Sequence, residues 1–421
     1  MVPGYQGMNY IDAQDYRLFA HTTGGPRKMK ILAVVSTIDL KNKLGCTPAW
    51  WQLLKALYEI GHEVIVVPYL GHPVESLWWR TYQNPCERES LIYNAYLESR
   101  KKAGKSPSAK TFLSAIADQL IQNYVRPKWQ RFLSNLVDKE KDISLILFMN
   151  IPINHFTGIP SSIKKRWAIP VVFYDGDMPT ILPRYTISRG FKFNYYEKAN
   201  LSEYDAFFSN SKGSIPDIEQ MGARNISALY WGIDPDLASP VEIEQDIDVS
   251  FFGYGSDLRE EWMEKLITIP SREMPEAKFV VAGGGFKIDL GNAKLLGDLS
   301  YSQWRQFSCR SKINLNITRW SHTSVYASAT ARPFELAAYG ACIVSQPYSG
   351  IEEWFDVGRE IIVVTSENEA RKTYEWLLDA GDERQEIGDR ARQRILREHT
   401  YLHRAGELIQ ALNNGRSSHA G

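Results

Sequence analysis

Two charged residues, Arg332 and Glu335, stand at the expected start of a short helix in the C-terminal half of the chain. Pro333 suits a first helical position, Gly340 suits the residue just past a helix end, and 341–345 is a short apolar run typical of a buried strand. The amides of a helix N-terminus and an arginine can bind phosphate, and a carboxylate one turn further can accept hydrogen bonds from two ribose hydroxyls. This stretch therefore predicts a site for a nucleoside diphosphate.

Further candidates for this site precede the helix. The strand expected at 247–252 runs into Gly-Tyr-Gly-Ser and then Arg259, and glycines at a strand-to-helix turn let backbone amides approach an anion. A tight turn often needs glycine for its backbone conformation alone, so these glycines could have a purely structural role instead. A strand at 279–282 meets three glycines, and the polar loop 318–330 leads to the helix. The predicted nucleotide-binding residues are Gly253, Gly255, Ser256, Arg259, Gly283, Gly284, Arg319, His322, Thr323, Arg332, Phe334 and Glu335.

Two carboxylates in the N-terminal half follow a buried strand at 170–174. Asp175 and Asp177 flank a glycine there, and groups just beyond the carboxyl end of a parallel strand lie where open α/β sheets bind ligands. An Asp-Gly turn with capping acids is the alternative, and Asp175 suits it equally well. We expect a second binding site formed by Gly45, Trp50, Asp175, Asp177 and Asn210, and catalytic roles for Asp177, Arg259 and Arg332.

The composition limits the class of protein. A chain of 421 residues with 44% hydrophobic residues is long enough for two domains. Lys and Arg equal Asp and Glu at 49 each, so no overall field favours nucleic acid or an anionic membrane. The four cysteines are far apart without metal-like spacing, which predicts reduced thiols in the cytoplasm and no metal site. No run reaches the roughly 18 apolar residues needed to span a bilayer, although peripheral membrane contact stays open.

The order of expected elements predicts α/β architecture. A strand at 31–35, a helix ending near Glu59, Gly-His and a strand at 63–67 form the start of a doubly wound sheet. The loop between the first strand and helix lacks Gly-x-Gly-x-x-Gly, which counts against a dinucleotide-dependent oxidoreductase. Residues 71–141 read as a long helical region, which we interpret as an insertion.

The stretch from Arg332 to Ser345, with Gly350 to Phe355, resembles the nucleotide-sugar segment of GT-B glycosyltransferases, and within them the CgeB-like (spore-maturation) branch. The sequence motif of that branch consists of an arginine, an apolar residue, Phe-Glu, small residues, a glycine and a strand, in this order. The motif then continues with Gly-x-Glu-Glu-apolar-Phe. Its sequences also carry a Tyr-Asp-x-Asp segment followed by Pro, which favours a functional Asp177. The broader signature has another glutamate eight positions before Glu335, where this chain has Ala327.

The resemblance implies two Rossmann-like domains facing a cleft, with the helical insertion in the first. The predicted parts are an extension (1–28), an acceptor domain (29–235) with the insertion at about 71–141, a linker (236–246), a nucleotide-sugar domain (247–400) and a C-terminal helix (401–421) that returns to the first domain. The implied activity is transfer of a sugar from a nucleoside-diphosphate sugar to an acceptor hydroxyl, without metal and with retention. The co-substrate would be a UDP- or TDP-sugar, with no other cofactor.

Other classes stay open from the sequence. A nucleotide-sugar binding protein without activity would keep Glu335 and the arginines, and a two-domain sugar-nucleotide epimerase would share the fold. A DNA glucosyltransferase is disfavoured by the zero net charge, so we expect small-molecule partners and a monomer or homodimer. His322 and His399 could act as bases, or could serve capping and packing.

Overall fold

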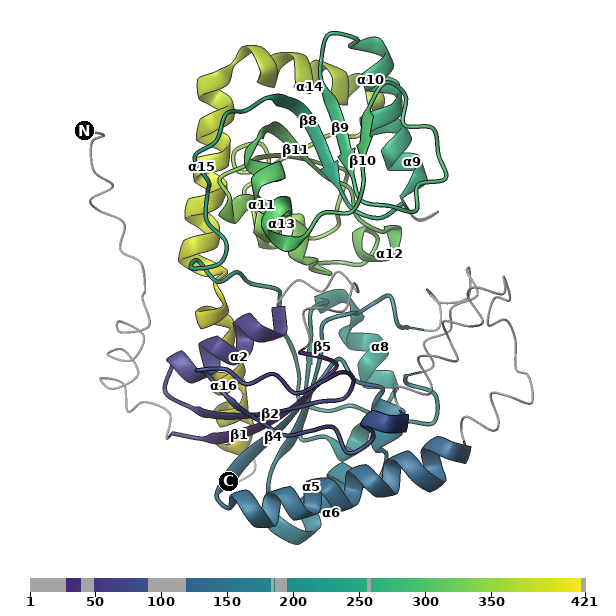
Figure 1. Ribbon diagram of the computed structural model, residues 1–421, viewed down its shortest axis with the longest axis vertical. Helices are drawn as coiled ribbons and strands as arrows, with labels where there is room; N and C mark the ends of the chain where they lie inside the picture. The colour runs from purple at the N-terminus through teal and green to yellow at the C-terminus, as the bar shows by residue number, and fades with distance from the viewer. Residues whose placement is uncertain are drawn as a thin grey trace. The chain divides into compact units, whose positions relative to one another are not determined.

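The computed structural model describes residues 28–38, 49–89, 119–182, 185, 195–255 and 259–417. The chain divides into two compact units (Figure 1). The N-terminal unit contains the described residues up to Tyr230 and takes up the chain again at Ala405, and the C-terminal unit contains Trp231–Arg404. The predicted sites at Gly45 and Ser256 lie outside the described residues.

The N-terminal unit is built on a parallel sheet of seven strands in the order β3-β2-β1-β4-β5-β6-β7. Most strands are continuous apolar runs, as expected for parallel strands covered on both faces. The strands are β1 (Lys30–Val35), β2 (Glu63–Pro68), β3 (Arg80–Thr81), β4 (Ile143–Met149), β5 (Val171–Asp175), β6 (Ala206–Ser209) and β7 (Ile226–Ala228). The helices are α2 (Ala49–Glu59), α5 (Arg126–Glu140), α6 (Ile159–Trp167) and α8 (Ile215–Gln220).

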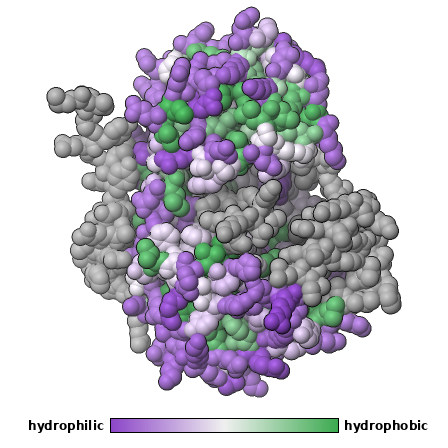
Figure 2. All heavy atoms as spheres, in the orientation of Figure 1, coloured by the Kyte–Doolittle hydropathy of each residue, from purple (hydrophilic) through white to green (hydrophobic). Residues whose placement is uncertain are grey.

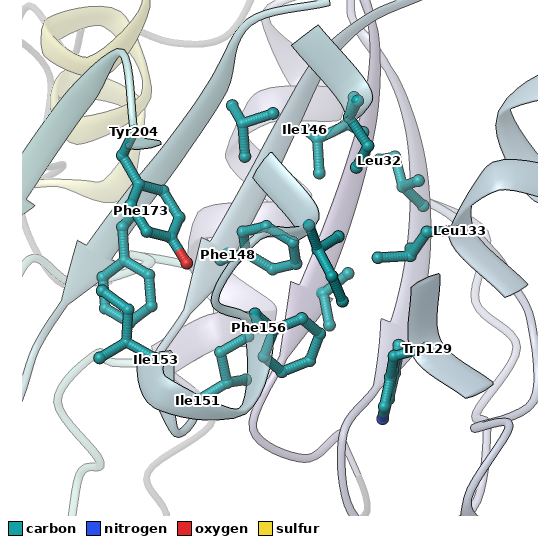
Figure 3. Packing of buried hydrophobic residues seen from close by; sticks show 14 of the residues in the cluster. Leu32, Trp129, Leu133, Ile146, Phe148, Ile151, Ile153, Phe156, Phe173 and Tyr204 are labelled. Atoms are coloured by element: carbon teal, nitrogen blue, oxygen red, sulfur yellow. The ribbon is translucent and has the colours of Figure 1, made fainter. Parts of the chain in front are cut away.

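An aromatic cluster packs one face of this sheet (Figure 3). The Phe156 ring lies 5.2 Å from Trp129 of α5 and 5.0 Å from Phe148 of β4. Tyr204 meets Phe148 edge-on at 6.1 Å. Burying several large rings together contributes much of the apolar area that holds helices on a sheet.

The C-terminal unit is built on a second parallel sheet, in the order β10-β9-β8-β11-β12-β13. Its strands are β8 (Ile247–Phe252), β9 (Phe279–Ala282), β10 (Lys294–Leu296), β11 (Ser311–Asn316), β12 (Cys342–Ser345) and β13 (Ile362–Val363). Its helices are α9 (Glu260–Met263), α10 (Ile269–Glu273), α11 (Tyr301–Cys309), α12 (Trp320–Thr323), α13 (Ala331–Ala338), α14 (Glu367–Asp379) and α15 (Gly381–Glu398). The prediction of two Rossmann-like sheets is confirmed.

The two sides of β8 carry different contacts. Phe251 joins the apolar cluster that contains Leu266 and Tyr374, whereas its neighbour Phe252 stacks on Trp304 of α11 with ring centroids 4.7 Å apart. Successive side chains of a strand point to opposite faces. The face on the Phe252 side is covered by α11 and α13 (Figure 1), and Trp304 meets Tyr339 edge-on at 6.1 Å.

Two predicted regions differ from the structure. The expected helical region 71–141 contains β3, which pairs with β2, and its residues 90–118 lie outside the described part. The loop 318–330 contains α12. Further along the chain, α14 and α15 are separated at Ala380, whose ψ of 71° is not helical.

Backbone hydrogen bonds join the two ends of the segment Trp231–Arg404, which makes up the C-terminal unit. The N–H of Ile233 donates to His399 O at 3.1 Å, and the N–H of Tyr401 donates to Ile233 O at 2.9 Å. The helix α16 (Tyr401–Ser417) begins here and, from Ala405, belongs to the N-terminal unit. Hydrophilic residues cover most of the visible surface of the described chain (Figure 2), and none of its helices is long and apolar enough to cross a membrane.

Candidate functional site

The helix α13 presents its N-terminus at the carboxyl edge of the second sheet. It begins at Ala331, two residues before Pro333, with Thr330 in extended conformation before it. The Thr330 side chain does not cap the helix. The uncapped first turn therefore keeps partial positive charge available for an anion.

The turn after α13 is as the sequence predicted. Gly340 has a φ of 69°, which glycine adopts without strain. The N–H groups of Gly340 and Ala341 donate to Ala337 O and Leu336 O at 2.9 and 3.1 Å. This pattern ends the helix sharply and starts β12.

Arg332 and Glu335 form a buried ion pair in α13. Arg332 Nη1 lies 3.6 Å from Glu335 Oε2, and the guanidinium lies over the rings of Trp304 at 3.9 Å and Phe252 at 4.7 Å. Burial raises the pKa of Glu335, and the charge of Arg332 opposes that rise. Glu335 Oε1 is itself buried and makes no hydrogen bond of standard geometry in the described part of the chain, while the Trp304 side chain nearby also lowers the pKa of this carboxyl.

Arg259, Arg319 and Arg332 concentrate positive charge beside this helix. Burial, together with the smaller effect of the charges of Arg319 and Arg332, lowers the pKa of Arg259 to about 9. Arg259 Nη1 donates to Tyr254 O at 2.5 Å, whereas its Nε has no partner among the residues described. Cations that repel one another at the end of β8 and β11 favour a multiply charged anion there.

The His322 side chain is packed inside the C-terminal unit. It is buried, and its Nδ1 lies 3.0 Å from Ser328 Oγ. Burial, together with the charges of Arg319 and Arg259, lowers its pKa to about 3. The ring is therefore neutral at pH 7, in line with the packing role that the sequence left open.

The glycine loops after β8 and β9 pack against each other. The N–H groups of Gly253 and Gly255 donate to Ala282 O at 3.0 Å and Gly284 O at 2.9 Å. A Cβ on Gly283 would lie 1.8 Å from Gly253 O. These two amides, expected to face an anion, are engaged with backbone carbonyls, so the loops need glycine for close approach. Ligand contacts by Gly253, Gly255, Gly283 and Gly284 stay predictions.

The Phe334 ring packs in the core of the second unit. It is fully buried and lies 5.6 Å from both Trp354 and His399 and 6.1 Å from Phe355. A ligand contact by Phe334 stays a prediction. The sequence suggested it because Phe334 adjoins Glu335.

Ala327, where the broader signature has a glutamate, is fully buried with a φ of 45°. Its N–H donates to Ser349 O at 2.9 Å, and a Cβ on Gly350 would lie 2.2 Å from its nitrogen. The backbones of Ala327 and Gly350 are therefore closely packed against each other. Thr323, in the preceding helix, donates from Oγ1 to Trp320 O at 3.3 Å.

The predicted acceptor residues of the first sheet meet at its carboxyl edge. Asp175 ends β5, and its carbonyl accepts the N–H of Asn210 at 3.1 Å. The Asp175 carboxylate is buried, receives the Tyr196 hydroxyl, and accepts the N–H of Asp177 at 2.9 Å. That last bond makes the Asp-Gly turn which the sequence left as an alternative. The Asp177 side chain is exposed.

Trp50, the remaining described acceptor candidate, is buried on α2 and meets Tyr174 edge-on at 6.2 Å. Burial, together with the charge of Asp177, raises the pKa of Asp175 to about 7 against the opposing effect of the hydrogen bond from Tyr196. Asp175 thus supports the turn, and Asp177 is the carboxylate that faces solvent.

Several groups were missed from the sequence. Trp304 and Phe252 hold Arg332, and Asn150 binds the Asp177 turn. Asn316 Oδ1 and Gln346 Oε1, at the ends of β11 and β12, are buried and lack hydrogen-bond partners among the described residues. A polar residue closing an apolar strand was the one signal available for Asn150, Asn316 and Gln346.

Part of the C-terminal half of the chain matches a known family model. Residues 259–410 match a family model described as glycosyl transferase-like. That segment contains Arg259, Arg319, Arg332 and Glu335. No curated protein matches the sequence.

Solved structures resemble the chain across both units. Sucrose-phosphate synthase from Thermosynechococcus elongatus is 12% identical, with 92% of this chain and 100% of that chain covered and a TM-score of 0.64. Anabaena HepE in complex with UDP and glucose is also 12% identical, with the same coverage and a TM-score of 0.59. TarM is 10% identical, with 92% and 99% covered and a TM-score of 0.60. These likenesses show the fold, and the predicted GT-B fold class is confirmed.

Proposed function

We propose that this protein is a glycosyltransferase that moves a sugar from a nucleoside-diphosphate sugar to an acceptor hydroxyl. The observation that carries the proposal is the arrangement around α13. There an uncapped helix N-terminus and three mutually repelling arginines adjoin a buried carboxylate, one oxygen of which makes no hydrogen bond of standard geometry in the described residues. A diphosphate fits the cations, and a ribose diol fits Glu335 Oε1.

The matched family model supports this activity, since it spans the residues of the cation cluster. HepE, which shares the fold, is in complex with UDP and glucose, so a UDP-sugar is our first candidate donor, with a TDP-sugar as second. The narrower CgeB-like assignment rests on the motif around Arg332 and Glu335. We also propose transfer with retention.

The proposed chemistry places charge stabilisation on this chain's own residues. Negative charge grows on the diphosphate as the glycosidic bond breaks, and Arg259, Arg332 and the α13 amides, together with Arg319, would stabilise it without metal. Asp177 would accept the proton of the acceptor hydroxyl. The predicted domain 29–235 would then bind the acceptor, and the predicted domain 247–400 would bind the sugar donor.

The deciding experiment combines binding with product analysis. Thermal-shift measurements with UDP, TDP, GDP and their sugars identify the nucleobase of the donor. A ligand stabilises the folded state according to the ratio of its concentration to its Kd. The preferred sugar nucleotide is then incubated with candidate acceptors. A glycosylated acceptor with release of the nucleoside diphosphate supports the proposal. An epimerised sugar nucleotide formed without acceptor, or binding without any product, would overturn it.

A further inference from the structure

Asn150 lies directly after β4 and binds the turn that carries Asp177. Its Oδ1 accepts the N–H of Gly176 at 2.7 Å, and its Nδ2 donates to Asp177 Oδ2 at 2.8 Å. One side-chain amide thus holds both the backbone and the carboxylate of the turn. The backbone of Asn150 has a φ of 48°, a left-handed conformation that asparagine adopts more readily than most residues.

The carboxylate of Asp177 needs such a donor because a second carboxylate is close. Asp175 Oδ1 accepts the N–H of Asp177 at 2.9 Å, which places two acidic groups on one short turn. Like charges disfavour ionisation of the pair, and a hydrogen bond to the charged form opposes that effect. The amide of Asn150 supplies this bond from a neighbouring strand, and at the same time limits the rotation of the Asp177 side chain.

We infer that Asn150 is a positioning residue that orients the Asp177 carboxylate toward the acceptor hydroxyl. The inference rests on the proposed function. In the transfer step the acceptor oxygen gives its proton to Asp177 and bonds to the anomeric carbon on the face from which the diphosphate leaves, as retention requires. The bond from that carbon to the diphosphate oxygen breaks, and its electron pair leaves with the nucleoside diphosphate. The proton passes from Asp177 to solvent, to which this side chain is exposed.

Two substitutions separate support of the turn from orientation of the carboxylate. Asn150→Asp keeps an oxygen for the Gly176 N–H but has no N–H for Asp177, whereas Asn150→Ala removes both. We expect kcat to fall about tenfold or more in both variants, the effect of losing a hydrogen bond to a charged group, with donor Kd unchanged. Wild-type kcat in Asn150→Asp would overturn the inference, because turn support alone would then explain Asn150.

Asn225 offers a matched control. It too is left-handed, with a φ of 50°, and its Nδ2 donates to Asp205 O at 2.8 Å, but it precedes β7 and is far along the chain from the turn. Asn225→Ala should lose a similar hydrogen bond and keep its kcat. If it loses kcat as Asn150→Ala does, general destabilisation explains both, and the inference is overturned.

A double variant makes the test independent of folding effects. In an Asp177→Asn background, adding Asn150→Asp should lower kcat by less than about twofold, because coupled residues are not additive. If Asn150→Asp lowers kcat as much in the Asp177→Asn background as it does in the wild type, the inference is overturned. Failure of the wild type to glycosylate any acceptor counts against the proposed function, whereas active wild type with unaffected Asn150 variants counts only against the role of Asn150.

Discussion

Arg332 Nη1 lies 3.6 Å from Glu335 Oε2, one turn further along α13. The same guanidinium lies over the Trp304 ring, so the arginine is held on one side by an aromatic face and on the other by the carboxylate. Glu335 Oε1 stays without a hydrogen-bond partner in the described residues. In the proposed function, this is the oxygen that would accept the ribose hydroxyls.

Glu335→Ala should weaken binding of the nucleoside diphosphate by about ten- to a hundredfold, the effect of losing charge-assisted hydrogen bonds to the ribose. Calorimetric titration with the parent and the 2′,3′-dideoxy nucleotide checks the cause. Wild type should prefer the parent nucleotide, and the variant should bind the two alike. Equal discrimination by both proteins would leave Glu335 only the weaker role of a charge near a helix N-terminus.

The arginine cluster should make transfer independent of metal. We expect kcat to be unchanged by EDTA, and to fall about a hundredfold or more in Arg259→Gln, because a donor aimed at developing charge is lost. Arg272→Gln, which removes an exposed ion pair with Asp289, is the control and should keep its kcat. Loss of turnover on chelation and its recovery with Mg²⁺ would show that the arginines do not suffice.

Asp175 should make stability depend on pH. Its pKa is about 7 in the folded protein and about 4 in an unfolded chain, so the folded state holds its proton more tightly. This contribution is complete below about pH 4 and is lost as the pH rises to 7. Between pH 5 and 7 the free energy of unfolding of wild type relative to Asp175→Asn should fall by at most about 3 kcal/mol. Denaturation at several pH values measures it, and a constant difference would contradict it.

Gly283→Ala should be strongly destabilising. The φ of Gly283 is 114°, and an added Cβ would lie 1.8 Å from Gly253 O, so backbone strain and a clash combine to cost about 2 to 4 kcal/mol. Gly297→Ala is the control, because its Cβ would meet nothing within 4 Å. Comparable melting temperatures of the two variants would show that the glycine loops are not packed as described.

The sequence predicted what depends on local pattern. Apolar strands, Gly340 as the end of α13 and the acids after β5 all follow from residues close together in the chain. The positions of Arg332 and Glu335 within a helix followed in the same way. Local signals suffice because helix ends and parallel strands each need particular residues at fixed offsets.

Contacts between distant segments could not be predicted. The Trp304 ring meets Arg332 only because α11 and α13 cover the same face of the second sheet. Phe334 is adjacent to a candidate ligand residue in sequence, yet its side chain points into the core. Asn150 carries no motif, and its role depends on β4 and β5 being neighbours in the sheet.

The return of the chain at Ala405 has a consequence for synthesis. Residues from Ala405 belong to the N-terminal unit, and Leu408 and Ile409 are buried. During translation the ribosome makes all of Trp231–Arg404 before this helix emerges. The N-terminal unit is therefore made first but completed last. Until α16 emerges, the apolar surface that this helix covers stays exposed. The partly made chain is then most prone to aggregation or to capture by a chaperone.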